Sequence, residues 1–290
     1  MYKTILPPKD LEGYISFFYV MEKEVKDLKH QQKELLMPSG TAIVGFHYLG
    51  NWILHGEEFL KSKQVLNMPT FYVAGQQTIS YDLTISKNKT GILGAALKPT
   101  TLWKWLKIPM YTLTNEVVNS AIIFGSDFEI INNNFKKLYT EEERLACVID
   151  FFRNLSKDKL SNPSMVEVAL DEIYSKKGCI TIKELLQKTG LKERSLQQSF
   201  KKEVGISPLQ YARIIRFNNV FVEIAKDRED LDLAFLTAFY NYYDASHLNK
   251  DFKSYLGEAP SAFTLEKYEL LQELIKEIPY LIQVQQRKNP

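Results

Sequence analysis

Basic and amide side chains recur at helical spacing in two stretches of this sequence. The two sets, related by an offset of 52 residues, are Arg194, Gln197, Gln198 and Lys201, and Ser246, Asn249, Lys250 and Lys253. Steps of three, four and seven residues place each set on one face of a helix. Arginine pairs with guanine, glutamine pairs with adenine, and lysine neutralises phosphates. These residue types therefore favour recognition of double-stranded DNA.

Apolar residues repeat at the same offset on the opposite face of each helix. The matched pairs are Leu196 and Leu248, Phe200 and Phe252, Val204 and Leu256, Gly205 and Gly257, Pro208 and Pro260, and Tyr211 and Phe263. A single amphipathic helix with a charged face is usually only a solvated helix of a bundle. A duplicated glycine and proline frame with matching polar faces instead favours two equivalent units that present a helix to a partner.

Capping signals place a shorter helix before the first of these faces. Gly190 ends a helix over residues 182–189, because a tight turn between helices needs a residue that accepts a positive φ. Thr181 and Glu184 form a capping box at the start of that helix. Upstream, Asn162 before a proline predicts another helix start, and two lysines and a glycine at 176–178 predict its end.

The second unit has equivalent signals. Asn241 stands at the turn, where asparagine tolerates the left-handed conformation, and Asp244 can cap the following helix. Ser207 and Gln210 form a further capping box at the start of the segment that joins the units. A helix, a turn and an amphipathic helix make a helix-turn-helix, so we predict recognition helices over 192–203 and 245–256 that enter successive major grooves.

These residues resemble the AraC family of bacterial transcription regulators over about residues 162 to 265. "YNYYDASHLNKDFKSYLGEAPSAF" is similar to the second-unit signature of that family, and "RIIRFNNV" to its long connecting helix. The stretches "LMPSGTAIVGFHYLG", "YVAGQQTISYDL" and "GAALKPTTLWKWLKIPMYTLT" more weakly resemble the cupin-like sensor domain of some members. The resemblance implies a regulator whose DNA-binding residues are Lys192, Arg194, Ser195, Gln197, Gln198, Lys201, Arg213, Arg216, Ser246, Asn249, Lys250 and Lys253.

The sequence departs from the family pattern at several of these positions. Lys192 stands where a serine cap is usual, Gln198 and Lys250 where arginine is common, and Asn241 replaces the turn glycine. Ala259 also replaces the last serine or threonine cap, and Thr237 a small alanine. We expect a different base preference from the common pattern, and each change in the second unit to cost about 1 kcal/mol.

Local charge ranks the two units. Residues 188–216 carry a net charge of +5, whereas residues 217–265 carry −4. Affinity for DNA rests largely on phosphate neutralisation, which an acidic segment opposes. Asp251 lies on the second recognition helix itself, beside Lys250. We therefore predict that the first unit supplies most of the binding free energy.

The order of elements predicts an α+β fold in which a barrel-like β domain precedes an all-α domain. Five runs rich in β-branched and aromatic residues, separated by turn signals at 38–40 and 87–88, are "YISFFYVM", "TAIVGFHY", "TFYVAG", "ISYDLTI" and "GILGAAL". From Pro99 on, including "NEVVNSAIIFG", apolar spacing is helical. The predicted parts are 1–110, a sensor or dimerisation domain; 111–160, a helical connector; 161–265, the DNA-binding domain; and 266–290, a helical tail.

Composition excludes several classes of protein. No apolar run reaches the ~18 residues of a membrane span, and two cysteines, Cys147 and Cys179, build no disulfide framework, so we expect a cytoplasmic protein. His47 and His55 lack a neighbouring ligand pattern, and no phosphate-binding or nucleophile motif occurs. We expect no metal, cofactor or enzymatic activity. The rival hypotheses are a cupin-type enzyme and a protein-interaction module with weakened DNA binding.

The expected partners are promoter DNA, a small-molecule effector, a second copy of the chain, RNA polymerase for an activator, and no membrane. The effector hypothesis rests on aromatic residues that line a pocket or only fill the core of the β domain: Phe17, Phe18, Tyr19, Phe46, Tyr48, Trp52, Phe71 and Tyr72. Trp103 and Trp105 cannot both face inward, so we expect one of them to meet the neighbouring domain.

Overall fold

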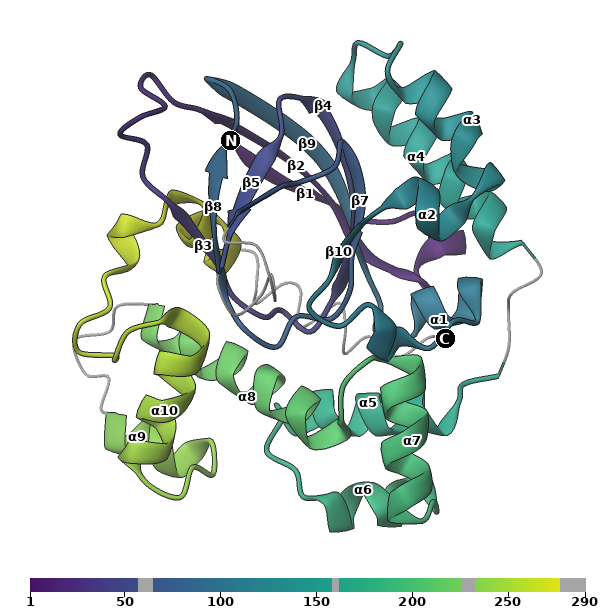
Figure 1. Ribbon diagram of the computed structural model, residues 1–290. Coiled ribbons are helices and arrows are strands. Elements are labelled where there is room, and N and C mark those ends of the chain that lie inside the picture. The colour runs from purple at the N-terminus through teal and green to yellow at the C-terminus, as the bar shows by residue number, and fades with distance from the viewer. Residues whose placement is uncertain (57–64, 158–161, 226–232, 277–290) are drawn as a thin grey trace.

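The computed structural model describes residues 1–56, 65–157, 162–225 and 233–276, and its N-terminal half holds two antiparallel sheets (Figure 1). The larger sheet has the strand order β1 (Tyr2–Ile5), β2 (Ile15–Glu24), β9 (Lys89–Leu97), β4 (Ala42–Leu49), β7 (Phe71–Ala74) and β10 (Val117–Asn119). The smaller has the order β3 (Glu34–Leu36), β8 (Tyr81–Ile85), β5 (Trp52–His55) and β6 (Val65–Asn67). The five predicted strands are confirmed, together with the turns at 38–40 and 87–88 that precede β4 and β9.

Alternation along β2 divides the β domain into two apolar layers. Phe17 and Tyr19 face the layer between the two sheets, whereas Phe18 faces the opposite side, because successive side chains of a strand point to opposite faces. On that opposite side pack α1 (Thr101–Leu106), α2 (Ser120–Phe124), α3 (Ser126–Phe135) and α4 (Glu141–Ser156). Figure 1 shows α3 and α4 along the outside of the larger sheet.

The predicted helical connector is not purely helical. Residues 117–119 form β10, which pairs with β7 at the edge of the larger sheet, where the sequence had predicted helix. Phe128 and Phe152, from α3 and α4, belong to the same buried cluster as Phe18 and Phe46 of the sheet. The short β-branched run at 117–119 was not predicted as a strand because the residues around it have helical spacing. Because α3 and α4 share a core with the sheet, we propose that the N-terminal domain extends through α4.

The regular elements of the described residues from 162 to 276 are all helices, as predicted. They include α5 (Met165–Ser175), α6 (Ile182–Thr189), α7 (Glu193–Glu203), α8 (Pro208–Ala225), α9 (Leu233–Phe239) and α10 (Ala245–Leu256). In Figure 1 the long helix α8 runs between α5–α7 on one side and α9–α10 on the other, below the sheets. Among the described residues no helix is both long and apolar enough to cross a lipid bilayer.

The chain returns to the β domain after the second unit. Residues 269–276 are helical, and the part of the expected tail beyond them lies outside the described residues. The backbone N–H of Leu270 donates to Glu34 Oε2 of β3 at 2.8 Å, and the Glu34 carboxylate, buried at 2% exposure, is neutralised by Lys23. This segment therefore closes the sheets on the side where β3 lies (Figure 1).

Candidate DNA-binding interface

Two helix-turn-helix units are formed, by α6 with α7 and by α9 with α10. Gly190 ends α6 at φ 68°, and Asn241, in the turn after α9, has φ 52°, so both predicted left-handed positions are confirmed. The recognition helices α7 and α10 lie within one residue of the predicted ranges 192–203 and 245–256.

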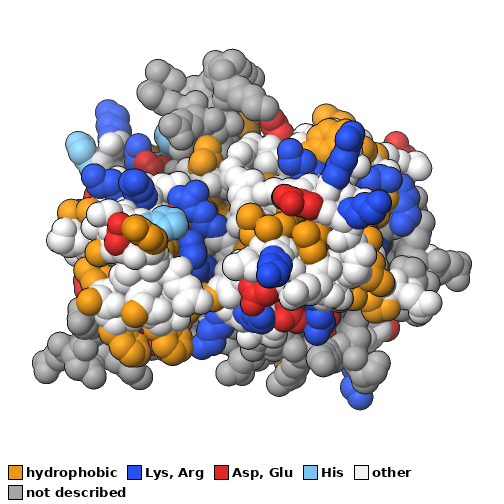
Figure 2. All heavy atoms as spheres, turned by 90° about the horizontal axis from the view of Figure 1, so that it is seen from below, with side chains coloured by type: hydrophobic (Ala, Val, Ile, Leu, Met, Phe, Trp, Pro, Cys, Tyr) orange, Lys and Arg blue, Asp and Glu red, His pale blue; other side chains and the backbone are white. Residues whose placement is uncertain are grey.

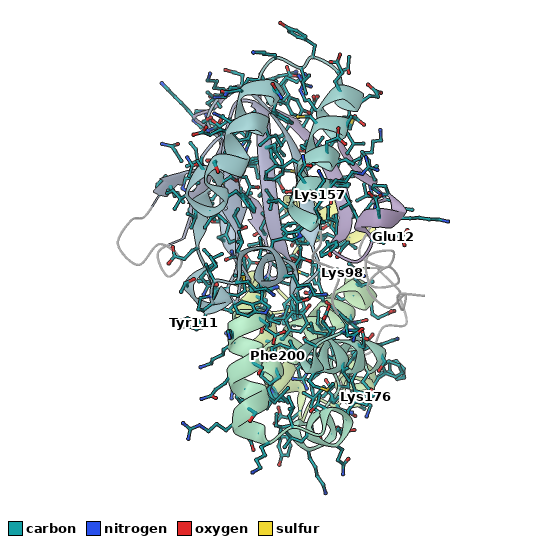
Figure 3. The ribbon with its side chains drawn as sticks, turned by 90° about the vertical axis from the view of Figure 1, so that its right-hand side faces the viewer. Glu12, Lys98, Tyr111, Lys157, Lys176 and Phe200 are labelled. Carbon is teal, nitrogen blue, oxygen red and sulfur yellow. The ribbon has the colours of Figure 1, made fainter. Side chains whose placement is uncertain are left out.

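Helix α7, the first predicted recognition helix, has a buried side and an exposed side. Leu196 and Phe200 are both 0% exposed and hold α7 against α5 and α8. Of the residues predicted to contact DNA in this unit, Arg194, Ser195, Gln198 and Lys201 are exposed and Gln197 is half-buried. Lys192, also exposed, stands at the N-cap without a capping side-chain hydrogen bond, as its departure from the family pattern predicted. Figure 3 shows Phe200 within the helical half.

Helix α10, the second predicted recognition helix, has the same arrangement. Leu248, Phe252 and Leu256 are buried, while Ser246, Asn249, Lys250 and Lys253 are exposed. Asp244 caps the helix by accepting a hydrogen bond from the backbone N–H of His247 at 2.7 Å, as predicted. On the face of the molecule seen from below, Lys and Arg side chains are spread among apolar ones, with several acidic groups between them (Figure 2).

Asp251 is buried and has partners, although its sequence neighbours had predicted a solvent-facing carboxylate. Its carboxylate, 0% exposed, accepts from Arg213 at 2.6 Å and from the Tyr242 hydroxyl at 3.0 Å, and Arg216 lies 3.8 Å away. Burial and this carboxylate raise the pKa of Tyr242, so the phenol stays a hydrogen-bond donor. Two predicted phosphate ligands, Arg213 and Arg216, therefore have a partner inside the molecule.

A signal for this cluster was present in the sequence. Asp251 lies three residues after Leu248 and four before Tyr255, so helical periodicity places it on the apolar face rather than on the solvent face. A buried carboxylate requires cations, and Arg213 and Arg216 stand three apart on the connecting helix. The net charge of −4 for residues 217–265 includes Asp251 as a group that repels DNA. In the folded protein Arg213 and Arg216 neutralise this carboxylate.

The caps of the brace helices are mostly as predicted. Thr181 and Glu184 form the predicted capping box, and a hydrogen bond from Lys176 lowers the pKa of Glu184 to about 2. The predicted cap at Asn162 is wrong: α5 begins at Met165, and its N-cap is Ser164 in a capping box with Glu167. The reason is that Ser164 and Glu167 satisfy two N–H groups reciprocally, which Asn162 alone cannot do.

The C-terminal end of α7 is held by the N-terminal domain. The Lys202 ammonium lies 4.6 Å from the centre of the Trp103 ring, and the Thr114 hydroxyl donates to the carbonyl of Gly205 at 2.8 Å. Trp105 is buried, so the prediction that only one of the two tryptophans meets the neighbouring domain is confirmed. Figure 3 shows Tyr111 and Lys98 along the boundary between the β domain and the helical half.

A second junction joins the turn before β4 to α8. The Tyr211 hydroxyl donates to the carbonyl of Gly40 at 2.9 Å, and Gln76 donates to the same carbonyl at 3.2 Å. Gly40 has φ 77°, and an added Cβ would lie 2.9 Å from Ile215 Cδ1, so a side chain here would be strained. The β domain and the helical half are thus hydrogen-bonded to each other at the start of α8 and just after the end of α7.

The aromatic residues of the β domain divide between a cavity and the core. Phe17, Tyr19, Trp52 and Tyr72 line a cavity between the sheets, α8 and residues 269–276. Phe18, Phe46 and Phe71 fill the core on the other face of the larger sheet. Tyr48 instead stacks with the Arg144 guanidinium, 4.3 Å from the ring centre. Some of these aromatic residues therefore line a pocket and others only fill the core, so each of the two hypotheses holds for part of the set.

The remaining candidate ligands do not converge. His47 is 3% exposed, bonds to the carbonyls of Pro69 and Thr70, and burial lowers its pKa to about 4. His55 bonds to the Thr84 hydroxyl at 2.8 Å. Burial raises the pKa of Cys147 and of Cys179, which are both free thiols. In the described ranges no three histidine, cysteine or acidic side chains are grouped to hold a metal ion.

Comparison with known proteins agrees with two units. A helix-turn-helix domain family matches residues 185–265, and a domain of unknown function (DUF6597) matches residues 3–119. No curated protein sequence matches the chain. ToxT of Vibrio cholerae is similar at 11% identity and a TM-score of 0.47, over 87% of this chain and 99% of that one.

Two further solved structures are similar to this chain. ToxT of Vibrio cholerae strain SCE256 with an unsaturated fatty acid bound has 12% identity and a TM-score of 0.44, over 84% of this chain and 93% of that one. The AraC-like transcriptional activator CuxR has 16% identity and a TM-score of 0.25, over 71% and 74%. The helix-turn-helix match contains both recognition helices.

Proposed function

We propose that this chain, a transcription regulator whose C-terminal domain is of the AraC type, reads DNA by placing α7 and α10 in successive major grooves. The observation that carries the proposal is the repeated pairing of a buried apolar back with an exposed basic and amide front on α7 and α10. A helix of this kind, braced by a preceding helix, fits the width of the major groove.

The residues of α7 have distinct roles in this proposal. Arg194 and Gln198, exposed on the front of the helix, contact base edges, and the half-buried Gln197 supports them from the same face. Lys192 and Lys201 neutralise phosphates at the two ends of the reading face. Ser195 lies beside them and adds a hydroxyl for a phosphate or base edge.

The second unit makes the weaker contact. Ser246 and Asn249 present short polar groups, and Lys250 and Lys253 supply the cations of α10. Arg213 and Arg216 act indirectly in this proposal: through Asp251 they fix α10 to α8, and thereby set the position of the second unit relative to the first. The Arg213 side chain is 42% exposed, which leaves part of its guanidinium group for a phosphate, whereas the Arg216 side chain is only 15% exposed.

The β domain senses a small molecule in this proposal. Support comes from the cavity that its sheets form with α8, the helix that joins the two units. A ligand there touches both the sensor half and the connecting helix, so its occupancy can bias the placement of the units.

One observation favours a protein contact in place of DNA for the second unit. Phe235, Phe239 and Tyr243 are 60%, 55% and 92% exposed on α9 and the turn that follows it. Exposed aromatic groups of this kind mark protein interaction surfaces. Under this alternative α9 and α10 dock a protein while α7 alone reads DNA.

A mobility-shift titration distinguishes these functions. The full chain is titrated into DNA fragments that flank its own gene and into shuffled fragments of equal length. The proposal expects at least one flanking fragment to bind ~10³-fold tighter than its shuffled version, the lower end for specific regulators. Equal affinity for both at every salt concentration would contradict sequence-specific reading.

A further inference from the structure

A cavity of about 160 Å³ lies where three parts of the molecule meet. Its walls come from the inner faces of both sheets, from Ile215, Asn218 and Asn219 of α8, and from Leu270 and Leu274 of the returning segment 269–276. The size bears on what fits, because a dry apolar cavity of roughly 150 Å³ binds benzene. The occupant is therefore on the order of six to ten non-hydrogen atoms, a benzene ring with at most a small substituent.

The floor of this cavity is a row of two tyrosines and two glycines across four strands. Tyr19 pairs with Gly94, Gly94 with Gly45, and Gly45 with Tyr72 along the register of β2, β9, β4 and β7. An added Cβ on Gly94 would overlap the Tyr19 ring, and one on Gly45 the Tyr72 ring. The glycines thus let both rings lie flat over the sheet, which makes a broad apolar floor.

The lining carries no charge. Among the described residues that line the cavity, none is a lysine, arginine, histidine, aspartate or glutamate. Burial raises the pKa of Tyr19 to about 12, so the phenols of the floor are neutral as well. A carboxylate placed here would lose its hydration without gaining a cation, which is strongly unfavourable.

Two buried acceptors of lining residues lack a hydrogen bond. Asn218 Oδ1, on α8, and Gln77 Oε1, after β7, have no partner among the described residues. A buried polar atom without a partner costs about 1–3 kcal/mol, so a ligand that donates to one of them recovers part of that free energy. Both oxygen atoms can accept a hydrogen bond from the same kind of ligand group, a hydroxyl or an N–H.

We propose that this cavity binds a neutral, mostly apolar molecule of about the size of a substituted benzene, whose single hydroxyl or N–H donates to Asn218 or Gln77. Because Asn218 belongs to α8 and Leu270 and Leu274 to the segment that follows the second unit, the ligand contacts elements on both sides of that unit. This proposal rests on the small-molecule sensing proposed above and names the class of ligand, and it does not depend on the proposed reading of DNA.

Three probes of one shape test the ligand class by calorimetric titration of the full chain at pH 7.5, without DNA. They are 4-propylphenol, propylbenzene and 4-propylbenzoate. We expect 4-propylphenol to bind about tenfold tighter than propylbenzene, which corresponds to one net hydrogen bond, and 4-propylbenzoate not to bind measurably. The proposal is wrong if the benzoate binds as tightly as the phenol, or if neither neutral probe binds.

Variants test the site itself. Asn218→Leu and Gln77→Leu each replace the amide by an apolar group of similar size and so remove one acceptor. At least one of them should abolish the tenfold preference for the phenol. Ala74→Leu, which fills the cavity from β7, should weaken both neutral probes at least tenfold. Asn154→Leu, an exposed asparagine on α4, is the matched control and should change neither affinity.

These outcomes separate the cavity from the DNA-binding function. If both acceptor variants still prefer 4-propylphenol over propylbenzene, or if Ala74→Leu binds the neutral probes as tightly as the wild type, the probes bind elsewhere and the proposal is wrong. A cooperative thermal transition for each variant establishes that it is folded before titration. Because DNA is absent from every titration, a chain that fails to bind promoter fragments can still satisfy all of these expectations.

Discussion

At the scale of single residues, Arg194 carries the sharpest prediction. Arg194→Ala should weaken binding to the specific fragment by about 1–3 kcal/mol and leave binding to shuffled DNA nearly unchanged, because a bidentate arginine contact to guanine is lost. The side chain is exposed, so the stability of the fold should not change. Fluorescence anisotropy with both DNAs measures this ratio.

Two further variants serve as comparisons for Arg194→Ala. Lys201→Ala should weaken specific and shuffled DNA alike and reduce the slope of log K against log salt by about one, as expected for one phosphate. Lys183→Ala removes an exposed cation from the brace helix α6 and should change neither. If Arg194→Ala binds both DNAs as tightly as Lys183→Ala does, Arg194 does not contact base edges.

His47 makes the stability of the β domain depend on pH. Its folded pKa of about 4 lies below the ordinary value of 6.5, so the unfolded chain binds the proton more readily. The stability is complete above pH 6.5 and falls as the pH drops toward 4, by about 2 to 3 kcal/mol near pH 4.5. Urea unfolding at pH 7 and pH 4.5 should show this loss in the wild type and a smaller one in His47→Gln. An identical loss in both chains would assign it to other groups.

Residue-level features that depend on local chemistry were predictable from the sequence. The left-handed positions of Gly190 and Asn241 and the cap at Asp244 follow from neighbours within four residues. The burial of Asp251 was not predicted, because a carboxylate was assumed to face solvent. Its partners, Arg213 and Arg216, are about 40 residues away in sequence and only packing brings them to it.

At the scale of elements, the Asp251 cluster should hold α10 to α8. Asp251→Ala leaves Arg213 and Arg216 without their carboxylate and the Tyr242 hydroxyl without its acceptor. We expect a loss of about 2 to 3 kcal/mol, less than for a fully buried pair, because Arg213 is 42% exposed. Urea denaturation measures it, with exposed Lys253→Ala on the same helix expected to change stability by under about 0.5 kcal/mol.

The same elements allow the two units to be ranked at equivalent positions. Gln198 on α7 and Lys250 on α10 are both exposed and related by the 52-residue offset. We predict that Gln198→Ala costs more specific affinity than Lys250→Ala, because the first unit has the larger net positive charge. Because Arg213 and Arg216 neutralise Asp251, the second unit repels DNA less than its net charge suggests, so we expect a smaller difference in affinity between the two variants. Equal or larger loss in Lys250→Ala, measured by anisotropy titration, would reverse the ranking.

Helices and long strands were easier to predict than short strands. Strands β3, β6 and β10 have three residues each, too few for a period of two to emerge, and they exist because longer partners pair with them. β10 is a strand because β7 offers it an open edge, although the residues around it have helical spacing. Pairing over long sequence distance, not local preference, decided these elements.

At the scale of the whole molecule, the two halves share junctions that no local pattern indicates. Gly40, Tyr211 and Gln76 join the sheets to α8, while Lys202 and Trp103 join α7 to α1. The sequence predicted that one tryptophan would meet the other domain, but the return of residues 269–276 to β3 could not be foreseen. It depends on Glu34 and Lys23, which are far from that segment in sequence.

The central claim is that α7 and α10 enter successive major grooves on one face of the DNA. Hydroxyl-radical footprinting of the full chain on its tightest promoter fragment tests this directly. The account predicts two protected patches whose centres lie about 10 base pairs apart on the same face, with the patch of the second unit weakened in Lys250→Ala and retained in Lys183→Ala. A single protected patch that Lys250→Ala leaves unchanged would contradict it.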